Sequence, residues 1–257
     1  MADTLHFPDV SLLVTHYNRS RSLERLLQRF HDLDIHFGDI VVSDDGSRPE
    51  HLDYLKQLQE RLSFRLVTTP KNKGLGNNIN KGQDAVITPY TLYVQEDFDP
   101  LSAFGKHLTD GLSIMHERNE IDICRFYAYT VYPYLKPIRN GFSEMDFAVW
   151  KPGYMKFYMY SDHPHLRRSN FLQKFGRYVE GKKVEKTEYL MMMSFLRKKG
   201  RAVIFEDING NFEQKNSSAE PSTVRRNFWR ESQGVAITGM RHLYRHLKFN
   251  FDYLFVK

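Results

Sequence analysis

Apolar runs of strand length alternate with segments of helical apolar spacing along the first hundred residues. Four runs rich in β-branched and aromatic residues predict buried strands at 11–15, 39–43, 64–68 and 90–94. Between them, apolar residues recur every three or four positions, which predicts helices over 23–30, over 52–62 and up to about residue 86. A capping box from Ser47 to Glu50 would start the second helix. Strands that alternate with helices predict an α/β fold with a doubly wound, mainly parallel sheet.

The second half of the chain has a less regular pattern. It predicts a helix over 101–115, a long strand over 121–132, a helix over 189–200 and a strand over 201–205. Residues 133–180 are rich in proline, glycine and aromatic residues, and the pattern assigns no element to them. No linker separates the halves, so a single domain over residues 1–257 is expected.

Composition limits the classes of protein that fit. With 41% hydrophobic and 26% charged residues, the chain should fold as a globular protein. No apolar stretch approaches the roughly 20 residues of a membrane span, and the first residues lack the features of a signal peptide. Cys124 is the only cysteine, which excludes an intrachain disulfide and favours a cytoplasmic location. The net charge of +6 suits anionic partners, but nucleic acid is not expected because the basic residues are scattered and form no recognised motif.

Polar residues follow three of the predicted strands, at the ends where parallel sheets bind ligands. These segments are 15–19, 44–47 and 95–97, and a turn rich in Gly and Asn at 72–78 should join them at the same edge. Glu96 and Asp97 repel each other unless a proton or a cation intervenes, and a divalent metal that carries a phosphate suits such a pair. Each segment alone also fits a plain polar turn, and Asp44 to Ser47 also fits a helix cap.

The order of these segments resembles the GT-A glycosyltransferases of the family 2 type, which use nucleotide-sugar donors. The family opening, Pro or Thr followed by any residue, Tyr and Asn, matches 15–18, and its Asp-Asp-Gly-Ser motif matches 44–47. Its Asn-x-Gly turn and the helical Asn and Gly match Asn72, Gly74, Asn80 and Gly82, and its metal motif aligns with 95–97. The resemblance covers 10–100 well and 180–205 loosely. It implies a GT-A, Rossmann-like fold with an irregular acceptor-side carboxyl-terminal region.

The resemblance also implies roles for individual residues. The donor pocket would comprise Thr15, Tyr17, Asn18, Asp44, Asp45, Lys73, Gly74 and Glu96. Within it, Asp44 would accept a hydrogen bond from the base, which is most often uracil, and Asp97 would bind Mn²⁺ or Mg²⁺. The nucleotide-sugar half would span about 8–100, the acceptor-side half about 101–237, and a basic amphipathic helix 238–257.

Several positions depart from the family pattern. Gln95 replaces the first acid of the metal motif, so the metal would have fewer protein ligands. Ile79 replaces an arginine that often precedes the helical Asn, so Lys73 would supply the positive charge instead. The base of such enzymes is often the Asp of a Glu-Asp pair at a helix start. Here that pair is Glu188-Tyr189, so Glu188 is predicted as the base, with Glu185 in reserve and Asp162 as a third candidate. Both glutamates also suit a helix amino terminus without any catalytic role.

Basic residues suggest further contacts. His163, His165, Arg167 and Arg168 are predicted to contact the acceptor or the diphosphate, since Pro164 and the lack of a nearby cysteine argue against zinc. Lys215, Arg225 or Arg226 would neutralise the diphosphate. The helix at 238–257 carries basic residues around apolar ones, so it would either pack on its own domain or lie on the inner face of an anionic membrane.

These expectations define one main hypothesis. The chain would be a metal-dependent, inverting hexosyltransferase that moves a sugar from a UDP-linked donor to a glycan or lipid-linked acceptor in polysaccharide or glycoconjugate biosynthesis. A nucleotide-sugar-binding protein of the same fold without catalysis is the alternative, and the irregular Gln95 and Tyr189 motivate it.

Overall fold

The computed structural model describes residues 4–215 and 235–256. The first half contains β1 (Leu5–His16), α1 (Ser20–Asp32), β2 (Ile35–Asp44), α2 (Pro49–Arg61), β3 (Arg65–Val67), α3 (Leu75–Asp84) and β4 (Tyr90–Gln95). β1 pairs in parallel with β2 and β4, and β2 pairs in parallel with β3. Both faces of these strands are covered by other elements, which explains why they read as continuous apolar runs.

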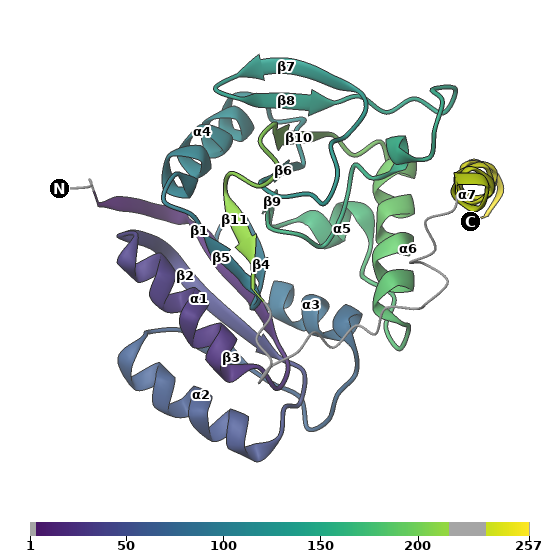
Figure 1. The fold of residues 1–257 in the computed structure, drawn as a ribbon. Coiled ribbons are helices and arrows are strands. Elements are labelled where there is room, and N and C mark those ends of the chain that lie inside the picture. Colours follow the sequence, from purple (N-terminus) through teal and green to yellow (C-terminus); the bar gives the residue numbers. More distant parts are fainter. Residues whose placement is uncertain (1–3, 216–234, 257) are drawn as a thin grey trace.

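The second half extends the same sheet with mixed strand directions (Figure 1). It contains β5 (Phe98–Pro100), α4 (Phe104–Glu117), β6 (Ile123–Arg125), β7 (Leu135–Arg139), β8 (Phe142–Met145), η1 (Met155–Phe157), β9 (His165–Arg168), α5 (Phe171–Phe175), α6 (Val184–Arg197), β10 (Ala202–Phe205), β11 (Phe212–Gln214) and α7 (Val235–Phe255). Within the described residues, the large sheet has nine strands in the order β3-β2-β1-β4-β9-β6-β10-β8-β7. The predicted α/β fold is confirmed, and the antiparallel pairings of the large sheet begin where β4 meets β9.

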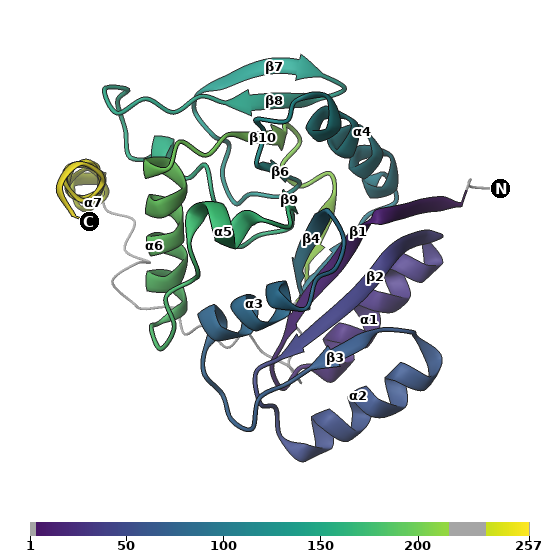
Figure 2. The same ribbon diagram turned by 180° about the vertical axis from the view of Figure 1, so that it is seen from behind.

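Alternate residues of the strands face two apolar cores on opposite sides of the sheet. Leu12 and Val14 of β1 face a core to which α1, α2 and α4 contribute, whereas Leu13 faces a core built with α3, α5 and α6. Figures 1 and 2 show these two sets of helices from opposite sides. The sheet edge where β1, β2 and β4 end is thereby held rigidly from both faces.

Two local predictions are wrong. The strand expected over 121–132 is only β6, because the following residues leave the sheet: the Phe126 N–H donates to Pro164 O and the Ala128 N–H to Ile208 O. Their apolar pattern reflects burial, not pairing. The capping box is also absent, since Arg48 is the N-cap of α2 and no side chain caps it.

A small second sheet brings a late segment of the chain beside the acidic turn that follows β4. β11 pairs antiparallel with β5, so Gln214 lies opposite Phe98, and the Lys215 N–H donates to Asp97 O at 2.7 Å. This pairing joins sequence positions more than a hundred residues apart, and it contributes Gln214 to the site described below.

Candidate active site

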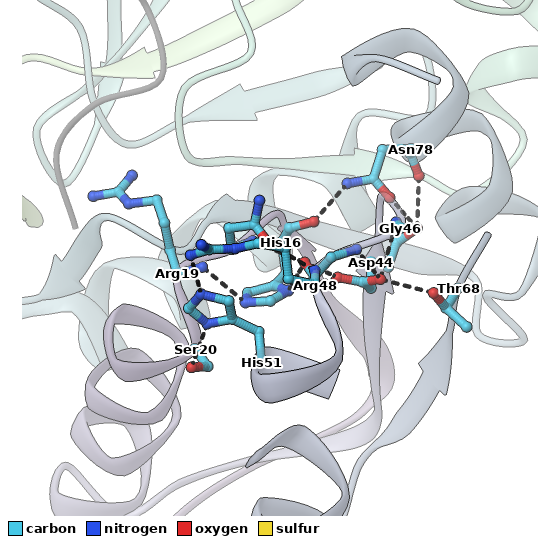
Figure 3. A network of polar contacts seen from close by, with 12 residues as sticks. His16, Arg19, Ser20, Asp44, Gly46, Arg48, His51, Thr68 and Asn78 are labelled. Carbon is cyan, nitrogen blue, oxygen red and sulfur yellow. Dashed lines mark hydrogen bonds and ion pairs between the residues drawn. The ribbon is translucent and has the colours of Figure 1, made fainter. Parts of the chain in front are cut away.

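The carboxyl ends of β1, β2 and β4 bring the three polar segments to one edge of the sheet. The strand register places His16 opposite Asp44 and Thr15 opposite Gln95. Figure 3 shows the polar network formed where the first two segments meet. The convergence expected from the sequence is therefore present.

Asp44 is completely buried in this network. Its Oδ1 accepts hydrogen bonds from His16 Nδ1, at 2.8 Å, and from the Ser47 hydroxyl. Its Oδ2 accepts from the Thr68 hydroxyl, at 2.7 Å, and from backbone N–H groups of the same loop. Burial alone would raise the pKa of Asp44, but these hydrogen bonds outweigh it and hold the pKa well below its usual range. Asp44 therefore orders the loop as an ion, and its contact with a base stays a prediction that requires one donor to be displaced.

Asp45 joins this loop to the turn that precedes α3. Its two oxygens accept the backbone N–H groups of Lys73 and Gly74, both at 2.9 Å. Gly74 has a φ of +87°, which a residue with a side chain would rarely adopt. Burial raises the pKa of Asp45. Asp45, Lys73 and Gly74, all predicted donor-pocket residues, are thus joined by hydrogen bonds. The Lys73 side chain is exposed to solvent.

Lys81 is a basic residue of this region that the sequence analysis missed. It is half-buried on α3, and its ammonium group donates to the backbone oxygen of Asp44. Burial lowers its pKa. The family pattern indicated Lys73 instead. Helical spacing could have indicated Lys81, because it follows Asn78 by three positions and both side chains therefore lie on the helix face toward β2.

The remaining donor-pocket candidates on the β1–α1 connection have different environments. Thr15 is buried, and its hydroxyl bonds with Tyr93 Oη at 3.1 Å. Asn18 has a φ of +54°, and its N–H donates to Ser47 Oγ at 2.8 Å. Tyr17 is half-buried. In this conformation Thr15 and Asn18 order the connection, and the half-buried Tyr17 stays a candidate for ligand contact.

The acidic turn after β4 contains a carboxylate oxygen that lacks a partner. Asp97 is 5% exposed, and its Oδ2 accepts a hydrogen bond from Gln214 Nε2 at 2.9 Å. Its Oδ1 is buried without a hydrogen bond. Arg19 Nη1 lies 3.4 Å from Glu96 Oε1 and 3.6 Å from Asp97 Oδ2.

These residues fit a divalent metal with few protein ligands. A buried carboxylate oxygen without a donor is costly, and a cation would satisfy it. Within 4–215 and 235–256, no group of three or more His, Cys, Asp or Glu side chains could hold a metal ion. A metal here would therefore take Asp97, with Glu96 beside it, and complete its shell from a ligand such as a diphosphate.

Glu188, the predicted base, lies against Asp162. Its Oε1 accepts the Asp162 N–H at 3.0 Å. Burial raises the pKa of Glu188, and the charge of the buried Arg125, which the sequence analysis did not single out, opposes that shift. Glu185 lies one turn earlier on α6 and is exposed. Tyr189, which replaces the family Asp, turns toward α7 and donates its hydroxyl to Asp252.

Asp162 is the more enclosed carboxyl of this pair. Its Oδ1 accepts the Tyr160 hydroxyl at 2.6 Å, while its Oδ2 is buried without a partner. Burial and the neighbouring Glu188 carboxylate raise its pKa to about 7. Gln95 Nε2 donates to Asp162 O at 3.2 Å. The residue that replaces a metal-motif acid therefore ties the acidic turn to the carboxyl pair.

Most of the predicted basic contacts are structural. Arg167 is fully buried and donates to Gln83 Oε1 and to the Tyr178 hydroxyl, and Arg168 donates to the carbonyls of Ile121 and Met115. His165 is also fully buried. The prediction that Arg167 and Arg168 contact the acceptor or diphosphate is therefore wrong, because their guanidinium groups bond within the fold. His165 Nδ1 donates to His163 O at 2.7 Å while its Nε2 is buried without a hydrogen bond, and its contact with a ligand stays a prediction.

Two other basic candidates lie near the acidic turn or beyond it. Lys215 Nζ lies 3.4 Å from Asp99 Oδ2 and 3.2 Å from Glu213 Oε2, so its charge is shared with carboxylates. Arg225 and Arg226 lie outside the described residues. A role for any of these in diphosphate binding stays a prediction.

A parallel sheet whose strand ends carry an Asp-Asp-Gly-Ser loop and an acidic turn, continued by antiparallel strands, defines the GT-A class of glycosyltransferase fold. The chain belongs to glycosyl transferase family 2, which matches residues 11–174.

Solved structures share the fold at low sequence identity. The S. aureus protein TarS, residues 1–349 in complex with UDP-GlcNAc, superposes with a TM-score of 0.62 at 16% identity over 96% of this chain and 76% of that chain. The mannosyltransferase PcManGT from Pyrobaculum calidifontis, in complex with GDP-Man and Mn²⁺, gives a TM-score of 0.56 at 12% identity over 94% and 65% of the two chains. These likenesses show the fold.

One curated relative also matches in sequence. The cholesterol galactosyltransferase of Borreliella burgdorferi is 24% identical over 134 residues. The match spans 50% of this chain and 36% of the relative, or about a third of that protein's length.

Proposed function

We propose that the protein is a metal-dependent, inverting transferase that moves a sugar from a UDP-linked donor to a glycan or lipid-linked acceptor. The observation that carries this proposal is the unpartnered Oδ1 of Asp97, held beside Glu96 where β4 ends and tied through Gln95 to the Asp162–Glu188 pair. The nucleotide sugars bound by TarS and PcManGT, and the Mn²⁺ of the latter, support it.

The residues divide the chemistry between two places. Asp97 and Glu96 would hold Mn²⁺ or Mg²⁺, which when bound would stabilise the charge that develops on the departing diphosphate. Glu188 would accept the proton of the acceptor hydroxyl while that oxygen bonds to the anomeric carbon and the bond to the diphosphate breaks. The Asp162 N–H holds Oε1 of Glu188, which leaves Oε2 for the proton.

Calorimetric titration of UDP tests the donor proposal. We expect binding in the presence of Mn²⁺ that weakens about tenfold or more in EDTA, because the acidic turn would then repel the diphosphate. UDP release from UDP-sugars would then be followed with and without acceptors. If no nucleoside diphosphate binds, the proposal is wrong, and if a donor binds but no acceptor ever yields product, the non-catalytic alternative replaces it.

We further propose that α7 brings the enzyme to an anionic membrane, where a lipid-linked acceptor would lie. One face of α7 packs on the protein: Phe249 is buried against Phe157, and Tyr253 contacts Phe147. Its opposite face exposes apolar side chains at helical spacing, each more than half exposed: Met240, Leu243, Tyr244, Leu247, Phe251, Leu254 and Phe255. No helix in the described part of the chain is long and apolar enough to cross a membrane.

Charge and position support a bilayer as the occupant of this face. Arg241, Arg245 and Lys248 are half-buried on the same helix. Arg245 donates to the Tyr154 hydroxyl at 3.3 Å and Lys248 pairs with Asp252, so Arg241 and Arg245 would supply the positive charge toward anionic headgroups. Trp150 is 84% exposed in the loop between Phe147 and Tyr154, two residues whose rings contact α7. Exposed tryptophan beside an apolar helix face is typical of the interfacial region of a membrane. Figures 1 and 2 both show α7 at the periphery beside α6.

Vesicle flotation tests this membrane proposal. We expect the protein to float with vesicles that contain phosphatidylglycerol and much less with phosphatidylcholine alone. Replacing Leu243 and Leu247 by glutamine should weaken binding by about tenfold for each leucine. Ile87→Gln, which changes an exposed apolar residue between α3 and β4, is the matched control and should float normally. Absence of flotation, or a stable dimer that these substitutions dissolve, would overturn the proposal.

A further inference from the structure

Arg19 places its positive charge where the proposed metal would bind. Its Nη1 lies 3.4 Å from Glu96 Oε1 and 3.6 Å from Asp97 Oδ2, and the three side chains are 7–12% exposed. One guanidinium therefore faces two carboxylates in a poorly hydrated site. The local charge remains negative, so the site still favours a divalent cation.

The backbone of Arg19 is fixed by a buried chain of hydrogen bonds. Its N–H donates to His16 Nε2 at 3.2 Å, and His16 Nδ1 donates to Asp44 Oδ1 at 2.8 Å. The Leu23 N–H donates to Arg19 O as α1 begins. Figure 3 shows the Arg19 side chain extending away from the His16–Asp44 pair. The root of the side chain is thus held, while its guanidinium reaches the acidic turn.

The ion pair between Arg25 and Asp99 gives a length with which the contacts of Arg19 can be compared. Arg25, also on α1, donates through Nε to both oxygens of Asp99 at 2.9 Å. That is the length of a well-formed charge-assisted hydrogen bond. The contacts of Arg19 Nη1 with Glu96 and Asp97 are longer by 0.5 Å or more. Arg19 therefore balances the charge of the acidic turn through contacts longer than those of a well-formed ion pair.

We infer that Arg19 is the counter-ion that the metal displaces and that it then binds the donor diphosphate. Without donor, Arg19 and the metal compete for Glu96 and Asp97. When the metal takes both acids, the guanidinium is released beside the phosphate oxygens, which it can bind in a bidentate manner. The inference rests on the proposed function and deepens it, because it couples metal binding to donor binding through one side chain.

Two binding measurements with opposite expected signs test this inference. Mn²⁺ alone is titrated by electron paramagnetic resonance, and UDP in saturating Mn²⁺ by calorimetry. Arg19→Gln should bind Mn²⁺ alone about tenfold more tightly, because a competing cation is gone, and should bind UDP about tenfold more weakly, because a phosphate contact is gone. Arg19→Lys should lie between this variant and the wild type. Arg25→Gln is the matched control and should change neither affinity.

The outcomes distinguish failure of the Arg19 inference from failure of the proposed transferase function. A purely structural role predicts that Arg19→Gln weakens both affinities together, and that result, or two unchanged affinities, would overturn the inference. The fold of each variant is checked by circular dichroism, and Arg19→Lys provides a second reading if the glutamine variant is unstable. A wild-type protein that binds Mn²⁺ but no UDP would instead overturn the donor proposal and the diphosphate role of Arg19 with it.

Discussion

Glu188→Gln is expected to lower kcat about 10³-fold while UDP affinity stays close to that of the wild type. A general base supplies roughly 10²–10⁴ of rate, and glutamine cannot take up the acceptor proton. The substitution preserves shape, and its amide oxygen can still accept the Asp162 N–H that now holds Oε1. Transfer rates at saturating donor, measured beside UDP calorimetry, would separate loss of the base from loss of the site.

Two variants of neighbouring carboxyls make this result specific. Glu185→Gln changes an exposed residue one turn earlier on α6 and should leave kcat within about twofold of the wild type. Asp162→Asn removes the third candidate and should reduce kcat less than Glu188→Gln. If Asp162→Asn were inactive and Glu188→Gln active, the base would be Asp162, whose buried Oδ2 has no partner.

If Glu188 is the base, the carboxyl pair should also set the pH dependence of turnover. The base works only when ionised, so kcat should rise with pH as Glu188 loses its proton. Burial raises the pKa of Glu188, and the paired Asp162 has a pKa of about 7, so the acid limb should lie between the ordinary glutamate value and neutrality. Removing one negative charge in Asp162→Asn should shift that limb to lower pH.

Local sequence was sufficient to place the polar segments that follow β1, β2 and β4 at one edge of the sheet. The strands end where apolar runs end, and parallel pairing brings the segments after β1, β2 and β4 to one edge. The positions of Asp44 and Asp97 at that edge therefore follow from periodicity and strand direction. The contacts of Asp44 do not, since its bond with His16 depends on the side-chain register of two strands. For the same reason the sequence did not reveal that Arg19, within the predicted segment 15–19, contacts Glu96 and Asp97, or that Lys81 on α3 donates to the backbone oxygen of Asp44.

The acceptor side depends on pairings that periodicity cannot reveal. β9 lies antiparallel between β4 and β6, and its four residues pair with positions forty or more residues earlier. This insertion buries Arg167 and His165, which look like ligands in the sequence because basic residues are usually exposed. In the sequence, Tyr189 stands where the family pattern has an Asp that serves as the base. In the structure, its hydroxyl donates to Asp252 on α7. A departure from the family motif here marks a packing contact between two helices.

Asp97→Asn is expected to reduce kcat/KM by about 100-fold or more, with the fold intact. The metal supplies several kcal/mol of stabilisation to a departing diphosphate, and that stabilisation is lost if the metal is lost. With Asn at this position, Glu96 and Arg19 would balance each other's charge, so the turn would no longer attract a divalent cation. Turnover with graded Mn²⁺, and Mn²⁺ affinity by electron paramagnetic resonance, would measure the effect.

Stability should respond to Asp97→Asn in the opposite direction from activity. The amide oxygen can keep the bond from Gln214, while a neutral amide group replaces a buried carboxylate and so removes the cost of burying its charge. The melting temperature without metal should therefore stay level or rise, as expected where a site holds charge for its ligand. Asp99→Asn is the matched control: this acid is paired with Arg25 and Lys215, so its loss should lower stability and spare turnover. If Asp97→Asn kept Mn²⁺-dependent turnover and Asp99→Asn lost it, the metal would belong to Asp99, and Arg25 would be the arginine that the metal displaces.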